Sequence, residues 1–181
     1  MNLRTFLPPP ATPTASSPAV GAAAPDLPEG APRDRPVVLA FLRHTGCPFA
    51  EWTARELRKA AEADEEIGWV AISHAPADAT AAWAEAVGGL GAATLLSDPE
   101  RAYYAAWGLG RSSLGHFAGG RSLAQVARLA RTGVRNRHPH GSRWQQAGTF
   151  GVDAERTVRW RHLPAHAGDL PDLSQAASAL K

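Results

Sequence analysis

The chain of 181 residues contains a single cysteine, Cys47, within the sequence RHTGCPFAEW at residues 43–52. This cysteine lies where an apolar run ends and a helical pattern begins, with Pro48 directly after it. A thiolate is a nucleophile, so this position can support nucleophilic or redox chemistry. One cysteine allows neither an internal disulfide nor a zinc site built from cysteines. Any disulfide formed in a reaction therefore needs a thiol from another molecule.

Three basic side chains are candidates to stabilise the Cys47 thiolate. Arg43 and His44 precede it, and Arg143 lies in GSRWQQ, just before a strand expected to run near the cysteine. A helix N-terminus stabilises an anion by roughly 0.3–1 kcal/mol, so a neighbouring cation is needed to favour the thiolate further. We expect Arg143 to be the main cation, with His44 or Arg43 as the alternatives.

Hydrophobic periodicity predicts the elements that position the thiol. The expected strands are residues 37–43, 67–73, 92–98, 148–153 and 157–163, and the expected helices are residues 48–64, 77–89, 99–108, 122–133 and 170–180. Asp98 and Pro99 read as the N-cap and first residue of the third helix. Loops are expected at 109–120 and 134–146. This order predicts an α/β fold with a mostly parallel central sheet, an antiparallel C-terminal hairpin and helices on both faces.

The N-terminal 35 residues differ from the rest of the chain in composition. They are rich in proline and alanine, which predicts an extended, partly disordered arm before a single domain at 36–181. Proline, threonine and serine interrupt the first residues, and no stretch has the apolar length of a membrane span. We expect no membrane partner and a cytoplasmic location.

Several stretches carry a family resemblance: FLRHTGCPFAE, WVAISH, LLSDPERAYYAAWGLGRSS, RNRHPHGSRWQQAGTFGVD and VRWRHLPAHAGDLPD. They resemble the peroxiredoxin-like branch of the alkyl hydroperoxide reductase and thiol-specific antioxidant group. The resemblance implies a thioredoxin-like fold, with the reactive cysteine after an early central strand. The chain also departs from that group. It has Ala40 and His44 where typical members have a proline and a hydroxyl residue, and Ala50 where many relatives have a second cysteine. In addition, it has Ala147 and Gly148 in the neighbourhood where thioredoxins have a cis proline.

The local chemistry and the resemblance together define an expected site. The expected catalytic residues are Cys47, His44 and Arg143. The expected substrate-binding residues are Arg43, Thr45, Pro48, Phe49, Trp107, Trp144, Gly148 and Thr149. The HPH tract at 138–140 has no carboxylates nearby, so we expect no metal site.

Three functions fit these residues. The first is a one-cysteine peroxidase, in which Cys47 reduces a peroxide and an external thiol such as glutathione or thioredoxin restores it. The second is a thioredoxin-fold enzyme with a non-redox or biosynthetic reaction on an organic substrate. The third is a noncatalytic binding protein. We expect no cofactor and no nucleic-acid partner. A second copy of the chain, in a homodimer, is a possible partner.

One interval of the chain is strongly basic. No Asp or Glu occurs between Glu100 and Asp153, and the interval contains Arg101, Arg111, Arg121, Arg128, Arg131, Arg135, Arg137 and Arg143. These arginines form either a cationic face that attracts an anionic substrate or a solvated helix face balanced by the acidic residues at 51–66.

Overall fold

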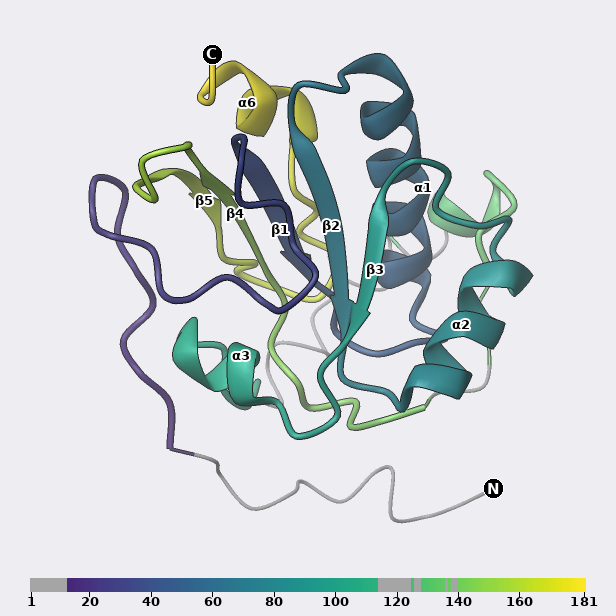
Figure 1. Cartoon of the computed structure of the whole chain (residues 1–181). Helices are drawn as coiled ribbons and strands as arrows, with labels where there is room; N and C mark the ends of the chain where they lie inside the picture. Colours follow the sequence, from purple (N-terminus) through teal and green to yellow (C-terminus); the bar gives the residue numbers. More distant parts are fainter. Residues whose placement is uncertain (1–12, 114–124, 126–127, 136, 138–139) are drawn as a thin grey trace.

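The computed structural model describes residues 13–113, 125, 128–135, 137 and 140–181 (Figure 1). Its centre is a five-stranded sheet in the order β3-β2-β1-β4-β5. The strands are β1 (Val37–Phe41), β2 (Gly68–Ser73), β3 (Thr94–Ser97), β4 (Gly148–Val152) and β5 (Val158–His162). Strands β1, β2 and β3 are parallel, and β4 pairs antiparallel with both β1 and β5. The predicted mostly parallel sheet with an antiparallel C-terminal hairpin is confirmed.

Helices cover both faces of this sheet, as predicted. They are α1 (Pro48–Ala63), α2 (Ala77–Ala86), α3 (Ala102–Ala106) and α6 (Leu173–Ser178). Buried residues of α1, α2 and α6 belong to one apolar cluster, whereas those of α3 belong to a second cluster on the opposite face. Figure 1 shows α1 and α3 on opposite sides of the sheet.

Strand β1 separates the two clusters by simple alternation. Val38 and Ala40 point into the cluster beneath α1, and Leu39 and Phe41 point into the cluster beneath α3. Successive side chains of a strand point to opposite faces, so a fully apolar strand buries both sides. The run that the sequence predicted as a buried strand therefore lies at the centre of the sheet, directly before Cys47.

Helix α3 starts later than predicted. The expected start was Pro99 with Asp98 as N-cap, but α3 begins at Ala102, after Arg101 in the left-handed conformation with φ 59°. The Asp98 carboxylate accepts hydrogen bonds from the backbone N–H groups of Ala102, Tyr103 and Tyr104. Asp98 thus accepts hydrogen bonds from the N–H groups of the first turn of α3, although residues 99–101 separate it from that helix. The capping residue predicted that a helix follows, but not the residue at which it begins.

The described part of the N-terminal arm, residues 13–35, packs along the domain. Its backbone pairs with the outer edge of β5 through Gly21 N–H to Val158 O (2.8 Å) and Val158 N–H to Ala22 O (2.9 Å). Leu27 and Ala31 are buried in the cluster beneath α3. Residues 13–35 are therefore part of the packed structure, and a domain boundary at residue 35 stays a prediction.

Two predicted segments fall partly outside the description. Of the helix expected at 122–133, Gln125 and residues 128–130 are helical, while the rest of the loop and helix between 114 and 127 is not described.

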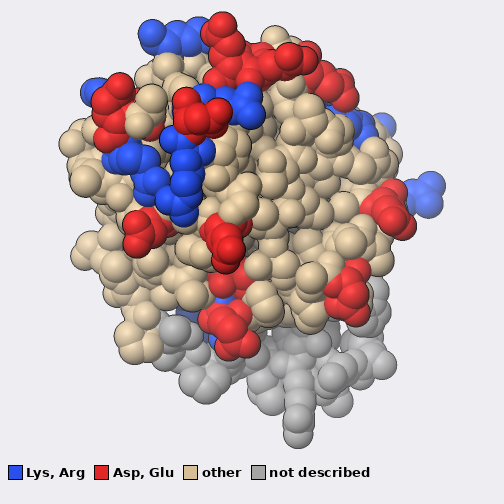
Figure 2. Space-filling model, viewed as in Figure 1, with Lys and Arg blue, Asp and Glu red and all other residues tan. Residues whose placement is uncertain are grey.

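No helix among the described residues is long and apolar enough to span a membrane. On the face shown in Figure 2, basic and acidic side chains adjoin one another near the upper edge and the middle is largely uncharged.

Candidate functional site

Cys47 lies in a tight turn between β1 and α1. Its backbone N–H donates to His44 O (3.2 Å), Gly46 has a φ of 87°, and Cys47 O accepts from Glu51 N–H (3.0 Å). Cys47 is the N-cap residue of α1, followed by Pro48 at the start of the helix. The sequence predicted this placement, in which the helix N-terminus favours a thiolate. The residue is only 2% exposed.

A second part of the chain packs against this turn. We call the described residues 134, 135, 137 and 140–145 the covering segment. Arg137 N–H donates to Gly46 O (2.9 Å), and Thr45 and His140 form an isolated antiparallel bridge. Val134 lies in the same buried cluster as Cys47. The covering segment therefore hydrogen-bonds to the two residues that precede the thiol, and Val134 packs in the apolar cluster that contains it.

Arg43 is a cation whose charge interacts with that of Cys47. Burial lowers the pKa of Arg43, the charge of Cys47 raises it, and the nearby charge of Arg143 lowers it. A guanidinium keeps its proton in proteins, so Arg43 places a positive charge in electrostatic reach of Cys47. Its Nε and Nη2 also donate to Arg143 O, each at 3.2 Å. The structure thus brings Arg143 beside Arg43, the residue that we expected only as an alternative cation.

His44 does not supply a positive charge at neutral pH. Burial lowers the pKa of His44 to about 4, with smaller contributions in the same direction from Arg43 and Arg143. Its Nδ1 lies 2.9 Å from Thr45 O, so Nδ1 carries the proton of the neutral ring. The prediction that His44 is an alternative cation is therefore wrong, because desolvation disfavours the imidazolium. A role for neutral His44 in proton transfer stays a prediction.

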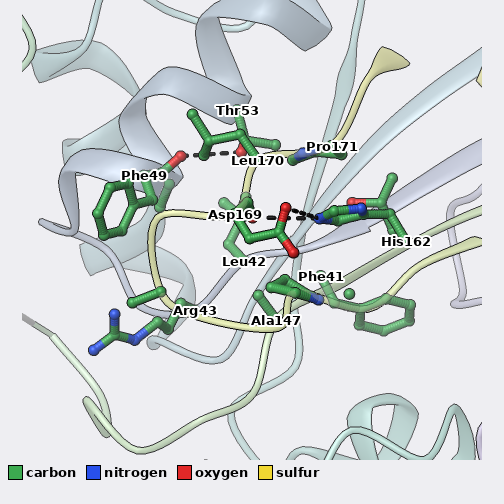
Figure 3. Close-up of a pocket in the computed structure, with 15 residues that line it drawn as sticks. Phe41, Leu42, Arg43, Phe49, Thr53, Ala147, His162, Asp169, Leu170 and Pro171 are labelled. Atoms are coloured by element: carbon green, nitrogen blue, oxygen red, sulfur yellow. Dashed lines mark hydrogen bonds and ion pairs between the residues drawn. The ribbon is translucent and has the colours of Figure 1, made fainter. Parts of the chain in front are cut away.

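A small pocket of about 40 Å³ lies beside the start of α1. Four residues expected to bind substrate line it, namely Arg43, Phe49, Gly148 and Thr149. Figure 3 shows Arg43 and Phe49 on one side and His162 with Asp169 on another. His162 Nε2 lies 3.6 Å from the Asp169 carboxylate. Cys47 itself is not among the lining residues, whereas Ala50 of the same helix is.

The other expected residues lie in different surroundings. Thr45 is buried and its hydroxyl donates to His140 O (3.4 Å), and Pro48 is buried in the first turn of α1. Trp144 belongs to the covering segment, and its carbonyl accepts from Ser112 N–H (2.7 Å). None of the three lines the pocket beside Arg43. In the HPH tract, His138 and Pro139 lie outside the described residues.

Trp107 is a core residue on the opposite face of the sheet. It has no exposed surface, and its ring centroid lies 5.7 Å from that of Phe41 and 4.8 Å from that of Phe150. The sequence placed it near the thiol because it flanks a glycine-rich loop. Alternation along β1 instead directs Phe41 and its aromatic neighbours away from α1, so we do not retain Trp107 in the site.

The segment before β4 has the geometry expected from its sequence. No peptide bond among the described residues is cis. Ala147 and Gly148 therefore enter β4 without the cis proline of the thioredoxin pattern, and both line the pocket. A side chain on Gly148 would meet Leu109 at 2.7 Å, so only glycine fits here without displacing the core.

Sequence reasoning missed Glu51. This carboxylate is only 1% exposed and contacts Arg55 Nη2 at 2.6 Å and Arg137 Nε at 3.2 Å. The sequence signal was the (i, i+4) spacing of Glu51 and Arg55 on one helix face. Glu51 was instead counted with the solvated acidic residues at 51–66. Its pairing with Arg137 shows that part of the basic interval is neutralised inside the protein.

The comparisons with known proteins agree with this architecture. The family model described as AhpC/TSA antioxidant enzyme matches residues 54–166, more than half of the chain, and its match begins after Cys47. A peroxiredoxin-like protein from Aquifex aeolicus superposes with a TM-score of 0.64 at 15% identity, covering 93% of this chain and 90% of that one. A thiol peroxidase from Chromobacterium violaceum has a TM-score of 0.59 at 14% identity, with 93% and 89% covered. The peroxidoxin BcpB from Mycobacterium tuberculosis has a TM-score of 0.55 at 22% identity, with 90% and 96% covered. No curated protein sequence matches the chain.

Proposed function

Because the chain belongs to the AhpC/TSA antioxidant enzyme family, we propose that it reduces a peroxide through Cys47, with an external thiol as reductant. One observation carries this proposal. The single cysteine lies at the N-cap of α1, and its charge interacts with that of Arg43. A helix N-terminus and a cation both favour the thiolate, which is the form that attacks a peroxide.

The proposed reaction has three balanced steps. The Cys47 thiolate attacks one peroxide oxygen, the O–O bond breaks, and the sulfur becomes a sulfenic acid while the alcohol or water leaves with a proton. A first external thiol then condenses with the sulfenic acid to give a mixed disulfide and water. A second external thiol releases Cys47 and forms the external disulfide. Since Ala50 stands where a resolving cysteine would lie, no internal disulfide forms.

The test is peroxide consumption by the parent protein and by Cys47→Ser. We expect the parent to consume peroxide in the presence of glutathione, and the variant to lose that activity at unchanged circular dichroism. Intact mass spectrometry should show a dimedone adduct of Cys47 after peroxide alone, and a glutathione adduct when the thiol is added. A parent that neither consumes peroxide nor forms the dimedone adduct would rule the peroxidase out.

The pocket supports a second candidate, an enzyme that acts on an organic substrate. Four of the residues expected to bind substrate converge on it, yet the sulfur-bearing residue does not line it. Such a pocket fits a small molecule with an apolar body, which Phe49 and Leu170 would contact, and an anionic group near Arg43. The same experiment separates the candidates, because a peroxide-inert Cys47 in a folded protein leaves this one in place.

A further inference from the structure

The buried carboxylate of Glu51 joins two parts of the chain that are far apart in sequence. It lies in the first turn of α1, one turn after Cys47. Its Oε1 accepts from Arg55 Nη2 at 2.6 Å, and its Oε2 accepts from Arg137 Nε at 3.2 Å. Oε2 also lies 3.4 Å from the backbone nitrogen of Arg135. A buried charge is tolerated only when it is paired and hydrogen-bonded, so Glu51 strongly favours this arrangement of partners.

Arg55 extends the same connection. Its guanidinium donates to Gly133 O at 3.2 Å and to Thr132 O at 3.4 Å, while it is held by Glu51. Residues 132, 133, 135 and 137 are therefore tied to α1 by one carboxylate and the arginines that pair with it. Arg137, the last of these residues, donates its backbone N–H to Gly46 O, next to the thiol.

We infer that Glu51 is a positioning residue that holds the covering segment over Cys47 and thereby controls which reagents reach the sulfur. The thiol is buried in the same apolar cluster as Val134, at the start of that segment. Reaction at Cys47 thus requires local opening, and the energy of opening is set largely by the contacts of Glu51. The inference concerns the thiol of the proposed peroxidase and deepens that function.

This arrangement gives a selectivity based on size. A reagent of a few atoms needs only a small displacement of the covering segment, whereas a bulky one needs the segment to detach. Apart from the buried side chain of Val134, the contacts that resist detachment are ion pairs and single hydrogen bonds, which exchange for water when they break. Glu51 therefore favours small oxidants over large electrophiles at the thiol.

The test compares two neutral alkylating reagents, iodoacetamide as the small one and monobromobimane as the bulky one. In Glu51→Gln and in Arg137→Gln, we expect the bimane rate to rise about tenfold or more and the iodoacetamide rate to rise less. The ratio of the two rates should therefore increase. The double variant should behave like Glu51→Gln within about twofold, because Arg137→Gln removes a connection that Glu51→Gln already removes.

The control is Asp153→Asn, which removes a comparable pair with Arg159 (2.5 Å). Asp153 follows Val152, which pairs with Val37 at the end of β1 remote from Cys47. This variant should keep the parent ratio even if it lowers global stability. An equal rise of the ratio in the control, or an unchanged ratio in both single variants, would overturn the inference.

Two further outcomes also have a definite meaning: a Glu51→Gln variant that does not fold, and a protein that is inert to peroxide. If Glu51→Gln does not fold, as judged by circular dichroism, Arg137→Gln decides alone, because its side chain is 32% exposed and its loss buries no unpaired charge. Alkylation requires no peroxide chemistry. A protein inert to peroxide but with the expected change of ratio would therefore refute the proposed peroxidase and support the role of Glu51.

Discussion

Two irregular segments pack against the sheet, and they are held in different ways. The N-terminal arm pairs its backbone with β5 and buries Leu27 and Ala31 in an apolar cluster. The covering segment is held mainly by polar contacts, at Gly46, Thr45 and the Glu51 carboxylate. One segment completes the core, and the other packs against the turn that carries Cys47.

The difference bears on which segment can open. Detaching the arm exposes apolar surface, which costs about 25 cal/mol per Å² and is not compensated by water. Detaching the covering segment exposes one buried apolar side chain, Val134, and otherwise replaces hydrogen bonds and ion pairs with contacts to water, and such bonds contribute only about 0.5–1.5 kcal/mol each. We expect the arm to open with global unfolding and the covering segment to open locally.

The largest expected effect is on stability, from Leu27→Ala in the arm. Leu27 is 2% exposed, and removing a buried leucine side chain costs about 3 kcal/mol of unfolding free energy. Urea denaturation measures this loss, with Val20→Ala as the matched control. Val20 lies in the same arm but is 58% exposed, so its change should stay within about 0.5 kcal/mol. Equal, small losses in both variants would show that the arm is not part of the core.

An effect of intermediate size on the unfolding free energy is expected when the pH is lowered, because His44 is buried beside the turn that carries Cys47. Burial lowers the pKa of His44 to about 4 from about 6.5 in the unfolded chain, so the unfolded state binds more protons between these values. The unfolding free energy should therefore fall as pH decreases, by about 2 kcal/mol between pH 7 and 5 from His44. His74 acts in the same direction, since burial lowers its pKa to about 3.

Urea denaturation at the two pH values checks this effect. His44→Gln should remove the share of His44 and leave that of His74. A His44→Gln protein that loses as much stability in acid as the parent would contradict the assignment of His44 as buried and neutral.

The smallest expected effect is on the rate at the thiol. Arg43→Met should slow iodoacetamide labelling of Cys47 at pH 7 by about tenfold, because a positive charge that acts on the thiolate is lost. Arg143→Met should have a smaller effect, and Arg128→Met, at an exposed helical position, should have none. A larger effect of Arg143 than of Arg43 would restore Arg143 as the main partner of the thiolate.

Much of the fold could be predicted because local patterns and the tertiary fold agree. The strand within the apolar run at 37–43, the helix expected at 48–64 and the hairpin at 148–163 all appear in the structure. These features depend on alternation, helical spacing and turn residues, which are local properties. The start of α3 was misplaced, because Asp98 caps its N–H groups from across a turn.

Only part of the candidate site could be predicted from the sequence, above all the position of Cys47. Cys47 was found from its type and its place before a helix, and Arg43, Phe49, Gly148 and Thr149 converge on one pocket as expected. Trp107 was placed on the wrong side of the sheet, because the face reached by a loop residue depends on long-range packing. Glu51 was overlooked, because its burial depends on residues 132–137, more than eighty positions away.

The sequence by itself determined that this chain has one thiol, that the thiol caps a helix after a central strand, and that no second thiol can resolve it. These conclusions need only residue identity and local periodicity. The tertiary structure decided which charges surround the thiol, that His44 is neutral, and that the covering segment closes over Cys47 through Glu51. Burial and charge pairing depend on contacts between distant residues, and the desolvation that shifts a pKa exists only once those contacts have formed.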